Sequence, residues 1–131
     1  MKKKILNSLL LVFIFVTIHQ SYWYFRYGGN FTIWCTNISD KNSINDVQIF
    51  LDDEKVFNED ISFFNKPSIY TIYPGTHKIK IICKSLGIGK EYSFNSFFVQ
   101  RGIFEFYFSD EENKIDVSFH NENVINAMVF Q

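Results

Sequence analysis

The chain has 131 residues, with 13 basic and 14 acidic side chains, a formal net charge of −1 and an aromatic content of 19%. This length allows one domain of about a hundred residues together with an N-terminal segment. Residues 31–131 hold nine basic and fourteen acidic groups, and this mildly acidic balance argues against nucleic-acid binding.

Residues 1–26 combine a basic start with a long apolar run. Lysines at positions 2–4 are followed by the almost uninterrupted apolar stretch Leu9–Ile18. Counted from Ile5 to Phe25, the segment has 21 residues and would be about 31 Å long as a helix, enough to cross the core of a bilayer. We therefore expect residues 5–25 to contact a membrane.

Two main interpretations of residues 1–26 stay open, an uncleaved signal anchor and a cleaved signal peptide; a soluble helix is a third, which the apolar run disfavours. Aromatic rings at the far end prefer the level of the lipid headgroups and favour the anchor. They are Tyr22, Trp23, Tyr24, Phe25 and Tyr27. The best cleavage site, His19–Ser21, lacks the A-x-A-like pattern of small residues.

The charge pattern also predicts the orientation. In either main interpretation, the basic start keeps the N-terminus in the cytoplasm and the domain outside it. The anchor would make a single-pass protein of the cell membrane, and cleavage would make a secreted or periplasmic protein.

After residue 26, we expect a short flexible linker at residues 27–30 and one folded domain at residues 31–131. Alternating apolar residues between turn signals mark the strands of this domain. The expected strands are residues 31–37, 47–52, 55–61, 91–99, 103–108, 114–120 and 124–130, and the expected loops and turns include 38–46, 85–89, 100–102 and 109–113.

The centre of the domain is Ser68–Lys84. Pro74-Gly75 predicts a β-hairpin or a tight corner between strands, because proline presets φ and glycine tolerates positive φ. The residues that follow alternate between apolar and basic, as in a strand with one face on a core. Seven to nine such strands predict an all-β fold, a single antiparallel β-sandwich preceded by one hydrophobic helix, with a small closed barrel as the alternative.

Two segments of the domain contain short motifs around turns. In Asp40–Glu54, DKNSINDVQIFLDDE, a polar loop precedes a V-x-V-x-L-type strand and a small acidic turn, and this segment is similar to the second strand of carboxypeptidase-regulatory-like domains. Tyr73–Ile79, YPGTHKI, resembles the P-G-[TY]-[HY]-x-[IL] corner of that group and of the related PEGA modules. Cys83–Gly87 stands where those domains have a glycine-containing turn. The resemblance covers roughly residues 31–109 and implies a transthyretin-like or immunoglobulin-like sandwich that serves as a non-catalytic accessory.

Cys35 and Cys83 are 48 residues apart, each on the apolar face of its strand. Two interpretations stay open. They are buried thiols that act as small hydrophobic side chains, or they form a disulfide in an exported domain.

The sequence contains no recognisable catalytic motif. The three histidines are scattered, the acidic turns lack the spacing of a calcium loop, and no nucleophile–histidine pairing stands out. We therefore expect no catalytic, metal-binding or cofactor-binding residues, and a protein that is not an enzyme.

Four aromatic residues lie on strand faces opposite the expected core: Trp34, Phe50, Phe97 and Tyr107. Either another segment covers them or they form a patch that binds a protein partner. The leading hypothesis is a membrane-anchored, extracytoplasmic β-sandwich that acts as a binding or structural accessory. The alternative is a small secreted inhibitor or immunity-type protein that binds its partner through an aromatic face or an edge strand.

Overall fold

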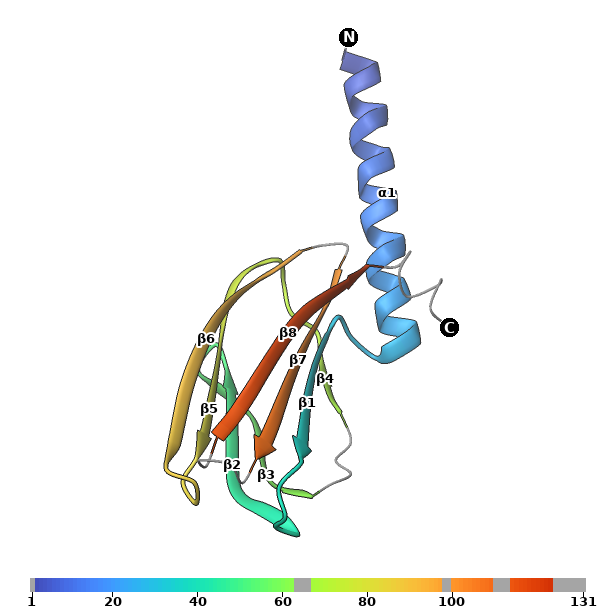
Figure 1. Cartoon of the computed structure of the whole chain (residues 1–131). Coiled ribbons are helices and arrows are strands. Elements are labelled where there is room, and N and C mark those ends of the chain that lie inside the picture. The colour runs from blue at the N-terminus through green and yellow to red at the C-terminus, as the bar shows by residue number, and fades with distance from the viewer. Residues whose placement is uncertain (1, 63–66, 98–99, 110–113, 124–131) are drawn as a thin grey trace.

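A computed structural model describes the chain except for residues 1, 63–66, 98–99, 110–113 and 124–131 (Figure 1). One helix precedes eight described strands. In chain order they are α1 (Lys2–Tyr27), β1 (Phe31–Asn37), β2 (Ser43–Leu51), β3 (Glu54–Ser62), β4 (Ser68–Tyr70), β5 (Gly75–Cys83), β6 (Ile88–Ser96), β7 (Gln100–Ser109) and β8 (Lys114–Asn123). The predicted all-β domain after one hydrophobic helix is confirmed.

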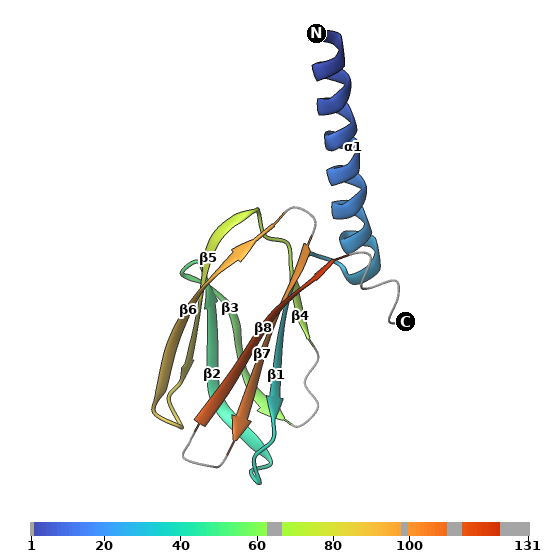
Figure 2. The ribbon, with the colours of Figure 1, turned by 45° about the horizontal axis from the view of Figure 1, so that its top comes forward.

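The strands form two four-stranded sheets that face each other across one core (Figures 1 and 2). Sheet A has the order β4-β1-β7-β8 and sheet B the order β3-β2-β5-β6. Alternate side chains of each strand point inward, so that Ile49 and Ile81 of sheet B and Phe104, Phe106 and Phe108 of sheet A are buried. Burying each such side chain stabilises the fold by about 1.5–3 kcal/mol, and together they explain why the two sheets stay packed.

One pair of strands departs from the antiparallel pattern that the sequence predicts. β1 and β7 run parallel, from Phe31 opposite Gly102 to Asn37 opposite Phe108. The other pairs in both sheets are antiparallel. Strand direction depends on which strands become neighbours, and the alternation of side chains is the same in both arrangements.

Pro74-Gly75 is a corner and not a hairpin. β4 pairs with β1 in sheet A, whereas β5 pairs with β2 and β6 in sheet B, so the chain crosses between the sheets at residues 71–74. The chain crosses back between β6 and β7. The predicted hairpin turn at residues 100–102 is therefore wrong, since these residues belong to β7. A Cβ on Gly102 would lie 3.0 Å from the ring of Phe31, so this glycine permits close packing.

Several strand boundaries also differ from the prediction, most of all the starts of β2 and β6. β2 begins at Ser43 inside the predicted loop 38–46, because an irregularity between Ile44 and Val47 interrupts the alternation. Asp46 has a φ of 59° there. β6 begins at Ile88, within the predicted turn 85–89. The predicted strand 124–130 and most of the predicted turn 109–113 lie outside the described residues.

Candidate functional site: the junction of helix and sandwich

Helix α1 projects from one end of the sandwich (Figure 1). Its segment Lys3–Tyr27 is long and apolar enough to cross a membrane. From Lys3 to Ile18 its side chains are exposed except for half-buried Val16. A helix that is apolar on all sides and bare of protein is typical of a membrane span, and a signal sequence has the same features.

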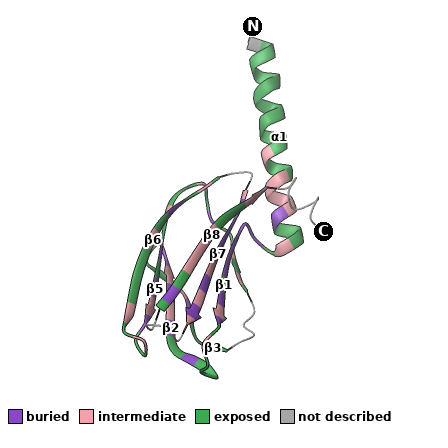
Figure 3. Cartoon of the chain, in the orientation of Figure 1, coloured by how far each residue is buried: buried purple, intermediate pink, exposed green. Residues whose placement is uncertain are grey.

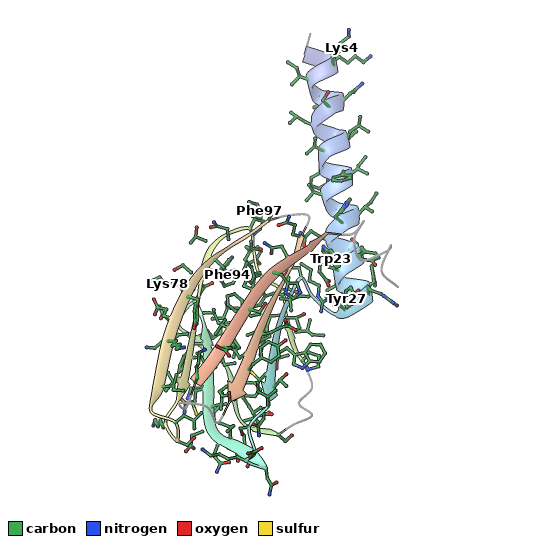
Figure 4. All side chains as sticks on the ribbon, in the orientation of Figure 1. Lys4, Trp23, Tyr27, Lys78, Phe94 and Phe97 are labelled. Atoms are coloured by element: carbon green, nitrogen blue, oxygen red, sulfur yellow. The ribbon has the colours of Figure 1, made fainter. Side chains whose placement is uncertain are left out.

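The environment changes in the last turns of α1, as Figure 3 shows. Residues 19–22 are half-buried and Trp23 has no exposed surface. The rings of Trp23 and Tyr27 lie 5.8 Å apart, and the guanidinium of Arg101 in β7 lies 3.9 Å from the centre of the Tyr27 ring. Figure 4 shows Trp23 and Tyr27 where α1 meets the sheets. The end of the helix is therefore part of the packed domain.

Two glycines end the helix and allow this contact. Gly28 has a φ of +84°, and its N–H donates to Tyr24 O at 2.8 Å, which is a left-handed C-cap. A Cβ on Gly29 would lie 2.2 Å from Tyr70 O of β4, so the backbone of the joint lies directly against the sheet. Residues 27–30, expected to be a flexible linker, are instead a packed joint, because their glycines let the backbone approach the sheet closely.

Asn30 links four parts of the junction. Its side-chain amide donates to Ile72 O at 2.9 Å, and its side-chain oxygen accepts from Ile72 N–H at 2.8 Å. It also donates to Gln20 Oε1 of α1 at 3.4 Å, while its carbonyl accepts from Gly102 N–H at 2.9 Å. Asn30 is 3% exposed, so these bonds satisfy polar groups that are removed from water. They hold the helix end, β1, β7 and the β4–β5 corner together.

Arg101 contributes a buried charge. The residue is 9% exposed on the outer side of sheet A. Its guanidinium donates to Glu122 Oε2 of β8 at 3.2 Å and to Thr32 Oγ1 of β1 at 2.7 Å. Together with the Tyr27 ring, these partners compensate for its burial through an ion pair, a hydrogen bond and a cation–π contact. The planar guanidinium thus joins α1 to three elements of sheet A.

His77 and Asp52 form a second polar cluster at the β4–β5 corner. His77 Nδ1 lies 2.6 Å from Asp52 Oδ2, and His77 Nε2 lies 2.6 Å from Tyr73 O. Both partners are acceptors, so both ring nitrogens donate when the ring is protonated. Asp52 Oδ1 also accepts from Lys78 N–H at 2.9 Å. The cluster ties the corner to the turn between β2 and β3.

The pKa values of this pair move apart. Burial lowers the pKa of His77, but the hydrogen bonds to Asp52 and Tyr73 and the Asp52 charge outweigh it and raise the pKa above 6.5. Burial raises the pKa of Asp52, but the hydrogen bonds from His77 and Lys78 and the His77 charge hold the pKa below 3.8. The pair is therefore ionised between these values and acts as a clamp.

Two grooves flank the corner. One of about 350 Å³ lies between the last turns of α1 and Thr71, and the other of about 450 Å³ lies beside Asp52, Tyr73 and His77. Within the described residues, His, Cys, Asp and Glu form no group of three that could hold a metal ion. The polar side chains named above mainly bind one another and the backbone.

Cys35 and Cys83 are both buried, and each is a free thiol in this structure. Cys35 faces inward from sheet A, and burial raises its pKa to about 12. Cys83 belongs to sheet B, where its Sγ lies 3.6 Å from Asn45 O and 3.3 Å from Ser85 Oγ. Both cysteines belong to the hydrophobic core between the sheets.

The four aromatic residues expected on an outer face do not come together. Trp34 (44% exposed) and half-buried Tyr107 share the outer side of sheet A, where Trp34 pairs with Glu105 and Tyr107 with Thr36. Phe50 is half-buried on sheet B, with Lys55 Nζ 5.6 Å from its ring centre. Phe97 (53% exposed) follows β6 at the end of the sandwich near α1 (Figure 4). These positions are three separate surfaces and not one patch.

Sequence reasoning missed Asn30, Arg101 and the His77–Asp52 pair. Asn30 contacts a residue 42 positions away, Arg101 contacts one 69 positions away, and His77 contacts one 25 positions away. The sequence offered a signal only for Arg101, which stands next to the aromatic residues of a strand. Charged residues are seldom buried without partners, so an arginine at such a position indicates a polar contact. Comparison with protein families, curated proteins and solved structures finds no match to this chain.

Proposed function

We propose that the protein is a membrane-anchored, extracytoplasmic β-sandwich that acts as a non-catalytic binding or structural accessory. The observation that carries the proposal is the division of α1 into a bare apolar part, Lys3–Ile18, and a last part that is built into the domain. A bare apolar helix in water would be costly, and a bilayer removes that cost.

The packed end of α1 supports an uncleaved anchor. Proteases act on exposed and flexible backbone. The best cleavage site, His19–Ser21, lies in regular helix with half-buried side chains, and Trp23 two residues later is fully buried. Cleavage there would cut the helix that carries Trp23 and Tyr27. The lysines at positions 2–4 support a cytoplasmic N-terminus by the positive-inside rule.

The proposal that the protein is non-catalytic rests on the hydrogen bonds of His77 and on the pKa of Cys35. A general base needs a ring nitrogen free to accept a proton, and both nitrogens of His77 are engaged at 2.6 Å. A nucleophilic cysteine needs a lowered pKa, and the pKa of Cys35 is raised to about 12. These groups are arranged for stability.

We further propose that the sandwich is related to carboxypeptidase-regulatory-like and transthyretin-like modules. The two segments that carry the resemblance are in contact, since Asp52 of the first bonds to His77 and Lys78 of the second. For a protein partner we propose the outer side of sheet A at Trp34, where Ile69 of neighbouring β4 is 39% exposed.

The intact mass of the protein from fractionated cells tests the proposal. We expect the full-length mass in a membrane fraction that resists high salt and alkaline carbonate. A mass trimmed near residue 21 in the soluble fraction would support the secreted inhibitor or immunity-type protein instead. Alkylation before and after reduction, in the same samples, distinguishes two free thiols from a Cys35–Cys83 disulfide.

A further inference from the structure

The bare part of α1 is too short to cross a bilayer by itself. From Ile5 to Ile18 there are fourteen residues, or about 21 Å of helix, whereas the hydrocarbon core is about 30 Å thick. Extending the span to Phe25 gives about 31 Å. A full crossing therefore has to include the turns of α1 that lie beside the sandwich.

Those turns cannot move away from the domain without breaking the junction. Gln20 is bonded to Asn30, Tyr27 lies under Arg101, and Gly29 lies against Tyr70. In Figures 1 and 2, the β4–β5 corner and the end of β6 lie at the same end of the sandwich as α1, nearer its N-terminus than the last turn of the helix is. Because this end of the sandwich is nearer the N-terminus than the last turn, placing Phe25 at the edge of the hydrocarbon core sets it at least as deep as that edge, in contact with the lipids of the outer leaflet.

This end carries exposed aromatic side chains. Tyr73 is 84% exposed and Phe97 is 53% exposed. Gly75 pairs with Ser96, so the residues just before β5 and just after β6 are neighbours. On the helix, Tyr24 is 62% exposed and Phe25 is 85% exposed. Aromatic rings in such numbers prefer the layer of lipid headgroups to water.

We propose that the end of the sandwich formed by Tyr73 and Phe97, together with Tyr24 and Phe25 of α1, is a lipid-binding surface that sits in the headgroup and upper acyl region of the outer leaflet. This inference rests on the proposed anchor and adds that the domain is held against the bilayer. The packed joint at residues 28–30 fixes how deep the domain lies in the membrane, because no flexible linker separates the membrane span from the domain.

Tryptophan fluorescence in phosphatidylcholine vesicles tests this surface. The full chain carries Trp23→Phe and Trp34→Phe, and one tryptophan is then introduced by Phe97→Trp or, independently, by Tyr73→Trp. Asn42→Trp is the matched control, because Asn42 is exposed in the loop between β1 and β2 at the far end of the sandwich. Phe15→Trp reports the span itself. The vesicles contain lipids brominated at a shallow or at a deep acyl position.

We expect shallow bromines to quench the tryptophan fluorescence of Phe97→Trp and Tyr73→Trp, whose emission should also shift to the blue. The fluorescence of Asn42→Trp should stay unchanged. Deep bromines should quench the fluorescence of Phe15→Trp. If Phe15→Trp is quenched while both sandwich probes behave like Asn42→Trp, the lipid-binding surface is refuted and the anchor stands. Quenching of Asn42→Trp to the same extent would also refute a surface confined to this end. An unquenched Phe15→Trp would refute the anchor and this inference with it.

Discussion

The two parts of α1 differ in environment although they form one continuous helix. From Lys3 to Ile18 the apolar side chains face outward on all sides, whereas Trp23, Tyr27 and the glycines that follow pack against the sandwich. In the proposed anchor, the first part depends on a lipid environment and little on the domain. The second depends on tertiary contacts and fixes how the domain is oriented relative to the span. Substitutions in the first part should therefore affect membrane retention, and substitutions in the second part should affect the stability of the domain.

The largest effect is expected from a charge in the bare part. Leu11 is 68% exposed, so Leu11→Lys should leave the sandwich folded, but a lysine at the centre of a span costs about 3 kcal/mol. We expect the protein to be lost from the carbonate-resistant membrane fraction. Asn42→Lys, which adds the same charge in the exposed loop at the far end of the sandwich, is the control and should be retained. Full retention of Leu11→Lys would show that α1 does not cross the bilayer.

Gly29→Ala should break the packed part. Its Cβ would lie 2.2 Å from Tyr70 O, and overpacking against backbone costs about 1–3 kcal/mol. Gly89→Ala is the matched control, because no atom lies within 4 Å of a Cβ there. Urea unfolding of both variants in detergent measures the difference. Equal stability of the two would mean that the joint is loose in solution.

Arg101→Gln compares a partly buried ion pair with an exposed one. It leaves Glu122 without its cationic partner and removes the bond to Thr32, for an expected loss of about 2–3 kcal/mol. Lys78→Gln removes the ion pair with Glu91, whose side chains are 62% and 49% exposed, and should cost less than about 1 kcal/mol. Chemical unfolding of both variants checks this order, which would be wrong if Lys78→Gln were the more damaging.

The smallest effect is expected at the His77–Asp52 clamp. The raised pKa of His77 stabilises the fold fully below pH 6.5, and this contribution is lost as the pH rises through the folded value. The lowered pKa of Asp52 stabilises the fold above pH 3.8, and this contribution is lost as the pH falls through the folded value. The free energy of unfolding, relative to that of His77→Gln, should be greatest between these limits. A flat difference would contradict the clamp.

Most of the sandwich was predictable because alternation is a local property. Phe104, Phe106 and Phe108 face the core as their spacing indicates, and β1 has the expected bounds. The predicted turn at residues 100–102 and the predicted linker at residues 27–30 were wrong because their glycines allow close packing. Gly102 lies against the Phe31 ring, and Gly29 lies against the backbone of Tyr70. Glycine looks the same in a turn, in a linker and at a close contact, so its neighbours decide its role.

The sequence by itself determined an apolar helix long enough for a membrane, a domain of alternating strands and a hairpin or corner at Pro74, because each depends on residues close together in the chain. Only the tertiary structure decided that the helix end is part of the domain, that β1 and β7 run parallel and that Trp34, Phe50 and Phe97 lie on separate surfaces. These features depend on which distant segments become neighbours, and that choice is made by the packing of the whole core.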